Sequence, residues 1–285
     1  MSIEIENLSY IYMQGTPFEK IALHDINLKI GNNEFAGVIG HTGSGKSTLI
    51  QHLNGILKPT SGKVLINGMD TSGKNLKELR RQVGIVFQYP EHQLFEETVY
   101  KDIAFGLYKQ NLSEDEVRSE ILQVIESVGL DEDVLEKSPF ELSGGQKRRV
   151  AIAGVLAMKP EILILDEPTA GLDPKGRDEI FNYITQIHRT LGITVILVSH
   201  SMEDIARLVD RVIVMNKGQI EMDGSVAEVF ADIQRLENIG LSAPQVAYLM
   251  KNLKKLYPEI DDRAYTVADA RDELLKYLKG GEYQR

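Results

Sequence analysis

The sequence predicts an α/β protein in which helices cover a parallel sheet. Two observations carry this prediction. Short apolar runs are typical of buried strands, and they occur at residues 35–39, 83–87, 162–165 and 194–198. Helical periodicity separates them, over residues 46 to about 57, over most of residues 99–156, and over about 15 residues between the last two strands. Alternation of strand and helix is typical of parallel sheets.

The N-terminal part predicts two half-buried strands. Apolar and polar residues alternate over residues 3–12 and 21–30, and a Gly-Thr-Pro run separates the two segments. A further strand is expected at residues 64–66. The helix that begins at Lys46 is expected to reach about residue 57 and to stop before Pro59, because proline cannot continue a helix.

The second half of the chain carries two local signals and a change of pattern. Ser113 and Glu116 have the spacing of a capping box at the head of a helix. Apolar segments at residues 211–215 and 219–222 flank Asn-Lys-Gly, which predicts a hairpin. Beyond Gly224 only helical patterns follow, so we place a boundary there and predict two domains, residues 1–224 and 225–285.

Composition excludes several classes of protein. The chain has 285 residues, 42% hydrophobic and 26% charged, which is ordinary for a folded globular protein. It has no cysteine, which excludes a disulfide framework, a thiolate zinc site and a cysteine nucleophile. The net charge of −10 argues against a nonspecific nucleic-acid binder. The N-terminus is unlike a signal peptide, and no apolar run is long enough to span a membrane.

A phosphate-binding loop is predicted between the strand at residues 35–39 and the following helix. The segment from Gly40 to Ser47 matches G-x-x-x-x-G-K-[ST] in the strand–loop–helix context that the motif requires. Glycines let backbone N–H groups surround phosphate oxygens, and the helix N-terminus adds partial positive charge. Lys46 is expected to reach the β- and γ-phosphates, and Ser47 to ligate Mg²⁺. A chance glycine-rich turn is the alternative, which this context disfavours.

Chemically active side chains follow the other buried strands. The run at residues 162–165 ends in Asp166 and Glu167, and a parallel strand delivers its end to the sheet edge where phosphate loops lie. Asp166 is expected to bind Mg²⁺ through water, and Glu167 to orient or deprotonate the attacking water. His200 and Gln88 end two further strands and reach the same edge. A helix cap and a structural histidine are the alternatives for these positions.

A second helix start suited to anions lies at residues 142–146, which read Leu-Ser-Gly-Gly-Gln. Ser143 is a good N-cap, and the glycines let a ligand approach the N–H groups of the new helix. An ordinary capped helix is the alternative. Two phosphate cradles with one nucleotide loop suggest a dimer, in which each nucleotide is held by one chain's loop and the other chain's Ser-Gly-Gly turn.

Together these motifs resemble the ATP-binding cassette (ABC) ATPases, over about residues 3–224. The resemblance implies a P-loop NTPase core with an antiparallel β subdomain, a helical subdomain at about residues 89–160 and a small C-terminal helical extension. ATP and Mg²⁺ are the implied cofactors. The implied metal-binding residues are Ser47, Gln88 and Asp166. The implied nucleotide contacts are Tyr12, Gly40, His41, Thr42, Gly43, Ser44, Gly45, Lys46, Ser47, Thr48, Ser143, Gly144, Gly145, Gln146 and Asp173.

The resemblance also implies individual roles. Tyr12 is expected to stack on adenine, with Tyr10 as the competing residue. Glu167, His200 and Gln88 form the implied catalytic set, with Gln88 sensing Mg²⁺ and coupling to a partner. Asp173 and the residues of the Ser-Gly-Gly-Gln run are expected to act across a dimer interface.

A finer resemblance rests on residues 40–42, 51–55 and 88–95, which are similar to energy-coupling factor (ECF) transporter ATPases, the last segment to their second ATPase type. It implies an ATP-hydrolysing motor at the cytoplasmic face of the cell membrane, powering uptake of vitamins or transition-metal ions. The implied partners are a related ATPase or a second copy, an integral membrane coupling subunit and, indirectly, a substrate-binding membrane subunit; no nucleic acid is expected. An ATPase of another ABC importer class and a soluble ABC ATPase are the alternatives.

Two surfaces stay open to two interpretations. Near Gln88, four apolar residues either receive a helix of the membrane partner or pack within the helical subdomain: Leu94, Phe95, Val99 and Tyr100. In the C-terminal extension, four residues at helical spacing form either the contact with the paired ATPase or a local core: Val246, Leu249, Met250 and Leu253.

Overall fold

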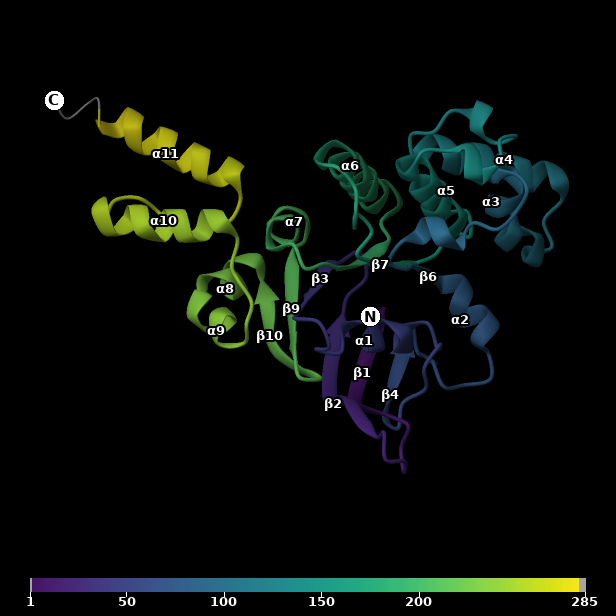
Figure 1. Ribbon diagram of the computed structural model, residues 1–285, viewed down its shortest axis with the longest axis horizontal. Coiled ribbons are helices and arrows are strands. Elements are labelled where there is room, and N and C mark those ends of the chain that lie inside the picture. Colours follow the sequence, from purple (N-terminus) through teal and green to yellow (C-terminus); the bar gives the residue numbers. More distant parts are fainter. Residues whose placement is uncertain (1, 282–285) are drawn as a thin grey trace.

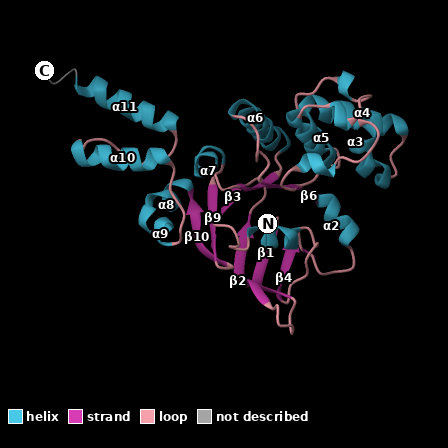
Figure 2. Cartoon of the chain, viewed as in Figure 1, coloured by secondary structure: helices cyan, strands magenta, loops and turns pink. Residues whose placement is uncertain are grey.

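The computed structural model describes residues 2–281, which form two sheets and their covering helices (Figures 1 and 2). The first sheet is antiparallel, with strand order β2-β1-β4-β5. Its strands are β1 (Ile3–Tyr12), β2 (Lys20–Ile30), β4 (Ser61–Ile66) and β5 (Met69–Asp70). This sheet is the expected antiparallel subdomain.

The second sheet has the order β10-β9-β3-β8-β7-β6 and is parallel except for the β9–β10 hairpin. Its strands are β3 (Phe35–Ile39), β6 (Val83–Val86), β7 (Ile162–Asp166), β8 (Thr194–Val198), β9 (Arg211–Asn216) and β10 (Gln219–Ser225). Because β3, β6, β7 and β8 run in the same direction, the loops after them meet at one edge. Those loops carry the predicted phosphate loop and the predicted catalytic side chains.

Both faces of the parallel sheet are buried, which explains the apolar runs that predicted it. Leu163, Leu165, Val195 and Leu197 pack on one face against the helical part of the protein. Their sequence neighbours Ile162, Ile164, Ile196 and Val198 pack on the other face, against the antiparallel sheet and the first helix. All eight side chains are at most 1% exposed.

The helices fall into three groups in space (Figure 1). A lobe on one side holds α3 (Val99–Leu107), α4 (Glu114–Ser127) and α5 (Gly144–Leu156). At the opposite end, α10 (Gln245–Leu256) and α11 (Val267–Gly281) project from the rest of the molecule. The remaining helices lie along the sheets: α1 (Lys46–Leu53), α2 (Leu76–Gln82), α6 (Pro174–Leu191), α7 (Met202–Leu208), α8 (Val226–Ala231) and α9 (Ile233–Asn238).

The structure confirms the predicted capping box and hairpin, but one predicted helix end was wrong. Glu116 N–H donates to Ser113 Oγ and Ser113 N–H donates to Glu116 Oε2 (2.8 Å), which confirms the capping box of α4. The hairpin between β9 and β10 is confirmed as well. The first helix ends at Leu53 rather than near residue 57, because Gly55 turns the chain at φ 65°.

The C-terminal extension contains two packing units. Val229, Phe230 and Leu236 belong to the main core, although they follow residue 224. A separate small cluster forms farther along, around Met250 and Ile260, with Ala264 and Ala270. The division at residue 224 stays a prediction, and the apolar packing continues across it. No helix in the described part of the chain has the length and apolar character to cross a membrane.

Candidate nucleotide-binding site

The glycine-rich loop after β3 has the backbone that a phosphate cradle needs. Gly40 and Gly45 have φ values of 153° and 107°, and α1 begins directly after the loop. A Cβ at Gly40 would lie 2.4 Å from the Met215 carbonyl oxygen, so only glycine fits there. A Cβ at Gly43 would meet nothing within 4 Å, which leaves open space on the side where a ligand would bind.

A hollow of about 700 Å³ lies over this loop at the carboxyl edge of the sheet. Its walls bring together predicted residues from five separate segments: Tyr12, Gly40, His41, Thr42, Gly43, Gly45, Lys46, Ser47, Thr48, Gln88, Asp166, Glu167 and His200. The sequence did not predict Lys20, Ala22, Met202, Gly240 and Leu241, which also line it. Strand β2, helix α7 and the α9–α10 connection therefore contribute wall residues that belong to none of the predicted motifs.

Lys46 projects into this hollow from the first position of α1. Its Nζ donates hydrogen bonds to the carbonyl oxygens of Gly40 (2.6 Å) and His41 (3.2 Å). Burial lowers the pKa of Lys46, and the nearby carboxylates of Glu167 and Asp166 oppose that shift. A half-buried cation that contacts loop carbonyl oxygens and lies near two carboxylates suits an anionic ligand that carries its own counter-ion.

Ser47 and Asp166 form the acidic, hydroxyl-bearing side of the hollow. Burial raises the pKa of Asp166, and the neighbouring Glu167 raises it further, while Lys46 and a hydrogen bond from Ser47 lower it. The described residues contain no group of three His, Cys, Asp or Glu side chains able to hold a metal alone. A hydroxyl and a carboxylate fit Mg²⁺, which keeps water ligands and shares phosphate oxygens.

Glu167 and His200 are in direct contact. Glu167 Oε1 lies 2.8 Å from His200 Nδ1, and the glutamate side chain is 14% exposed while the histidine is 77% exposed. Glu167 has a φ of 50°, and its N–H donates to the Val198 carbonyl oxygen (3.0 Å). This left-handed backbone at a non-glycine residue is held by the adjacent strand and aims the carboxylate at the hollow.

The structure separates the two tyrosines proposed for base stacking. Tyr12 is 36% exposed and lines the hollow. Tyr10 is half-buried and packs against the core that includes the antiparallel sheet. The geometry therefore favours Tyr12 for contact with a ligand.

The Ser-Gly-Gly-Gln run lies outside this hollow. Ser143 caps α5, accepting a hydrogen bond from the Gln146 N–H, and a Cβ at Gly144 or Gly145 would meet nothing within 4 Å. Asp173 caps α6 through the Gly176 N–H (2.9 Å). Neither motif lines the nucleotide hollow in the single chain, so their action across a dimer interface stays a prediction.

Of the four apolar residues near Gln88, three follow the packing interpretation and one stays available for a partner. Val99 is fully buried, because it begins α3 and packs into the main core. Leu94 and Tyr100 are partly buried against the same core. Phe95 is 60% exposed and meets Phe105, 42% exposed, edge to face at 5.0 Å. The exposed surface is therefore centred on these two phenylalanines.

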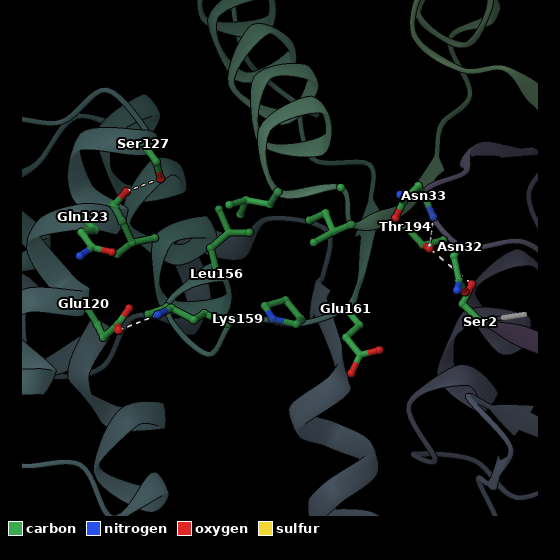
Figure 3. A pocket seen from close by; sticks show the side chains of 16 residues that line it. Ser2, Asn32, Asn33, Glu120, Gln123, Ser127, Leu156, Lys159, Glu161 and Thr194 are labelled. Atoms are coloured by element: carbon green, nitrogen blue, oxygen red, sulfur yellow. Dashed lines mark hydrogen bonds and ion pairs between the residues drawn. The ribbon is translucent and has the colours of Figure 1, made fainter.

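A second hollow, of about 460 Å³, lies at the opposite edge of the parallel sheet (Figure 3). Leu156 and Thr194 line it, and the Lys159–Glu120 ion pair (2.6 Å) lies at one side. Its lining includes none of the phosphate-loop or acidic residues, so it is not the nucleotide site.

Comparison with known proteins agrees with this geometry. Residues 23–170 match the family model described as "ABC transporter". An energy-coupling factor transporter ATP-binding protein EcfA2 of Acetivibrio thermocellus is 62% identical over 98% of this chain and 99% of its own length. The protein of the same name from Clostridium tetani is 60% identical over 97% of each chain.

Two solved structures resemble the fold. The structure of cbiO1 from Clostridium perfringens, described as part of the ABC transporter complex cbiONQ, has a TM-score of 0.75 and 42% identity, covering 87% of this chain and 98% of its own. A dimeric ATP-binding cassette, MJ0796, bound to ADP and Pi, has a TM-score of 0.71 and 31% identity, covering 79% and 98%. The chain therefore belongs to the ABC transporter family, as an ATP-hydrolysing subunit of the energy-coupling factor type.

Proposed function

We propose that this chain hydrolyses Mg²⁺–ATP in the hollow above its phosphate loop to drive uptake of vitamins or transition-metal ions through a membrane partner. One observation supports the site assignment: a single hollow unites Lys46, the Ser47–Asp166 pair and the Glu167–His200 pair. Phosphate binding, metal binding and water activation each have residues within it.

The residues divide the chemistry between them. The loop N–H groups and Lys46 hold the β- and γ-phosphates, and Ser47 and Asp166 hold Mg²⁺, which would offset phosphate charge when bound. Glu167 orients a water molecule and accepts its proton as the water oxygen bonds to the γ-phosphorus. The bond from that phosphorus to the bridging oxygen breaks, and ADP and phosphate leave. His200 holds Glu167 in place through the 2.8 Å contact.

A variant series tests this assignment. Glu167→Gln keeps the shape of the side chain and removes the base, so hydrolysis should fall at least about 100-fold while ATP binding persists. His200→Ala should reduce the maximal rate and leave the binding of ATP close to wild type. Glu203→Gln, on the exposed side of α7, is the matched control and should hydrolyse ATP normally. Full activity in Glu167→Gln would remove Glu167 from the mechanism.

The proposal includes a dimer of two ATPases, with a related chain favoured as the partner. The open helix start of α5 and Asp173 supply the groups that would close each nucleotide site from the opposite chain. The exposed side chains of Leu249 and Leu256, 51% and 72% exposed, supply apolar surface for pairing through the extension. Leu249→Glu combined with Leu256→Glu should weaken pairing in sedimentation analysis. Unchanged pairing would remove the extension from the interface.

The proposal places the chain at the cytoplasmic face of the membrane, held there by an integral membrane subunit. Phe95 and Phe105 supply the exposed apolar surface close to Gln88. Phe95→Asp should abolish transport in reconstituted vesicles while basal ATP hydrolysis remains. Leu191→Asp, at a side chain that is also 60% exposed but lies at the opposite edge of the parallel sheet, is the control. Retained transport in Phe95→Asp would exclude this surface as the docking site.

A further inference from the structure

Four residues beside the nucleotide hollow form a closed ring of contacts, and the tyrosine proposed to stack on the base is one of them. Tyr10 and Tyr12 lie on the same face of β1, with ring centroids 4.8 Å apart and planes at 90°. The Tyr10 ring also meets the His52 ring edge to face, at 4.8 Å. The hydroxyl groups of Tyr12 and Thr48 lie 3.2 Å apart, within hydrogen-bond distance. Thr48 and His52 are four residues apart on α1 and complete the ring.

The His52 imidazole is fixed in one orientation. The residue is fully buried, and its Nδ1 lies 2.7 Å from the Thr48 carbonyl oxygen. Because a carbonyl oxygen only accepts hydrogen bonds, Nδ1 carries the proton. Burial lowers the pKa of His52, which favours the neutral ring, and the edge-to-face contact with Tyr10 uses that ring as an aromatic surface.

This ring connects the two ends of the nucleotide site. The helix that carries Thr48 and His52 begins at Lys46, directly after the phosphate loop. The strand that carries Tyr10 ends at Tyr12, beside the hollow. The contacts between strand and helix therefore determine how far the Tyr12 ring lies from the phosphate cradle. If these side chains only stabilised the fold, replacing them would lower the affinity for every ligand of the phosphate loop by the same factor.

We propose that Tyr10 and His52 are positioning residues for the nucleotide base, which hold Tyr12 at the separation from the phosphate loop that ATP spans. This inference rests on the proposed role of Tyr12 in stacking on adenine. The two residues then contribute to the affinity for the base and not to the affinity for the phosphates. An aromatic contact of this kind corresponds to about a two- to tenfold change in binding.

The test compares ATP with inorganic tripolyphosphate, which has phosphates but no base. Calorimetry on the full chain with Mg²⁺ would measure both ligands for wild type, Tyr10→Leu and His52→Gln. ATP affinity should fall about three- to tenfold in both variants, with tripolyphosphate affinity within twofold of wild type. Tyr10→Phe and His52→Phe keep an aromatic ring and should bind ATP as wild type does. Thermal unfolding with each ligand confirms that every variant is folded.

A double variant decides whether His52 acts through Tyr12. In the Tyr12→Ala background, where ATP affinity should already be about tenfold lower, His52→Gln should cause no further loss. Equal losses for ATP and tripolyphosphate, or a His52 effect that persists without Tyr12, would overturn the inference. Normal ATP affinity in Tyr12→Ala would also overturn the inference, but it would not affect the assignment of the hydrolytic residues. A wild-type chain that binds neither ligand would refute the proposed function itself.

Discussion

Replacing Arg148, a buried arginine of α5, should strongly destabilise the protein. Arg148 is 2% exposed, and its guanidinium contacts the Glu91 carboxylate through Nε (3.2 Å) and Nη2 (2.9 and 3.0 Å). Its Nη1 also donates to the Ala170 carbonyl oxygen (2.9 Å). Arg148→Met fills much of the same volume but leaves the carboxylate of Glu91, 19% exposed, without its cation.

The magnitude follows from that geometry. Removing one partner of a buried ion pair costs about 3–5 kcal/mol, and the partial exposure of Glu91 favours the lower end, about 3 kcal/mol. For a chain of this size, that corresponds to a decrease in Tm of roughly 6–12 °C. Urea unfolding followed by circular dichroism measures the loss. The double variant Arg148→Met/Glu91→Leu should recover most of it, because no buried charge remains unpaired.

Two results would refute this reasoning. Arg148→Met within about 1 kcal/mol of wild type would mean that water solvates Glu91 well enough to replace the arginine. A double variant as unstable as the sum of its single variants would mean that the two residues act independently. Arg149→Met is the matched control, because its guanidinium is more exposed and pairs with Glu179, 36% exposed, at 3.1 Å; a loss below about 1 kcal/mol is expected there.

Three further predictions concern the site and one helix. Lys46→Ala should abolish ATP hydrolysis in a phosphate-release assay, and undiminished release would remove the phosphate loop from the mechanism. Because the pKa of Asp166 is raised in the folded chain, ionisation destabilises the nucleotide-free protein as pH rises through that pKa. Asp166→Asn should therefore unfold at higher urea than wild type at pH 7, with the difference shrinking toward pH 4 in paired titrations; a difference independent of pH would contradict this. Ser113→Ala should lower the free energy of unfolding by about 1 kcal/mol through loss of the α4 cap, measurable by the same urea titrations, whereas an unchanged midpoint would show that the cap contributes nothing.

The sequence predicted the strands of the parallel sheet well because burial on both faces demands continuous apolar runs, such as residues 162–165. It missed short elements whose existence depends on neighbours. Helix α7 (Met202–Leu208) has about two turns, and Ile205 packs it onto the sheet. The end of the first helix was predicted near residue 57 because the prediction relied on Pro59. In the structure the helix ends at Leu53, since the turn at Gly55 comes first.

The same holds for the predicted site: residues defined by their neighbours in the chain were predicted, and residues defined by contacts across the fold were not. Glycine loops and carboxylates at strand ends can be recognised in the sequence, because their chemistry depends on residues that are neighbours in the chain. Arg148 does not, since Lys147, Arg148 and Arg149 form a basic run that is typical of a solvated helix face. Only the fold shows that the middle one is buried, contacting Glu91 three residues after Gln88 and Ala170 three residues before Asp173. Arg148 therefore gives the segment after Gln88 a charged, hydrogen-bonded connection to α5 and to the loop before α6, which an exposed lysine at that position would not provide.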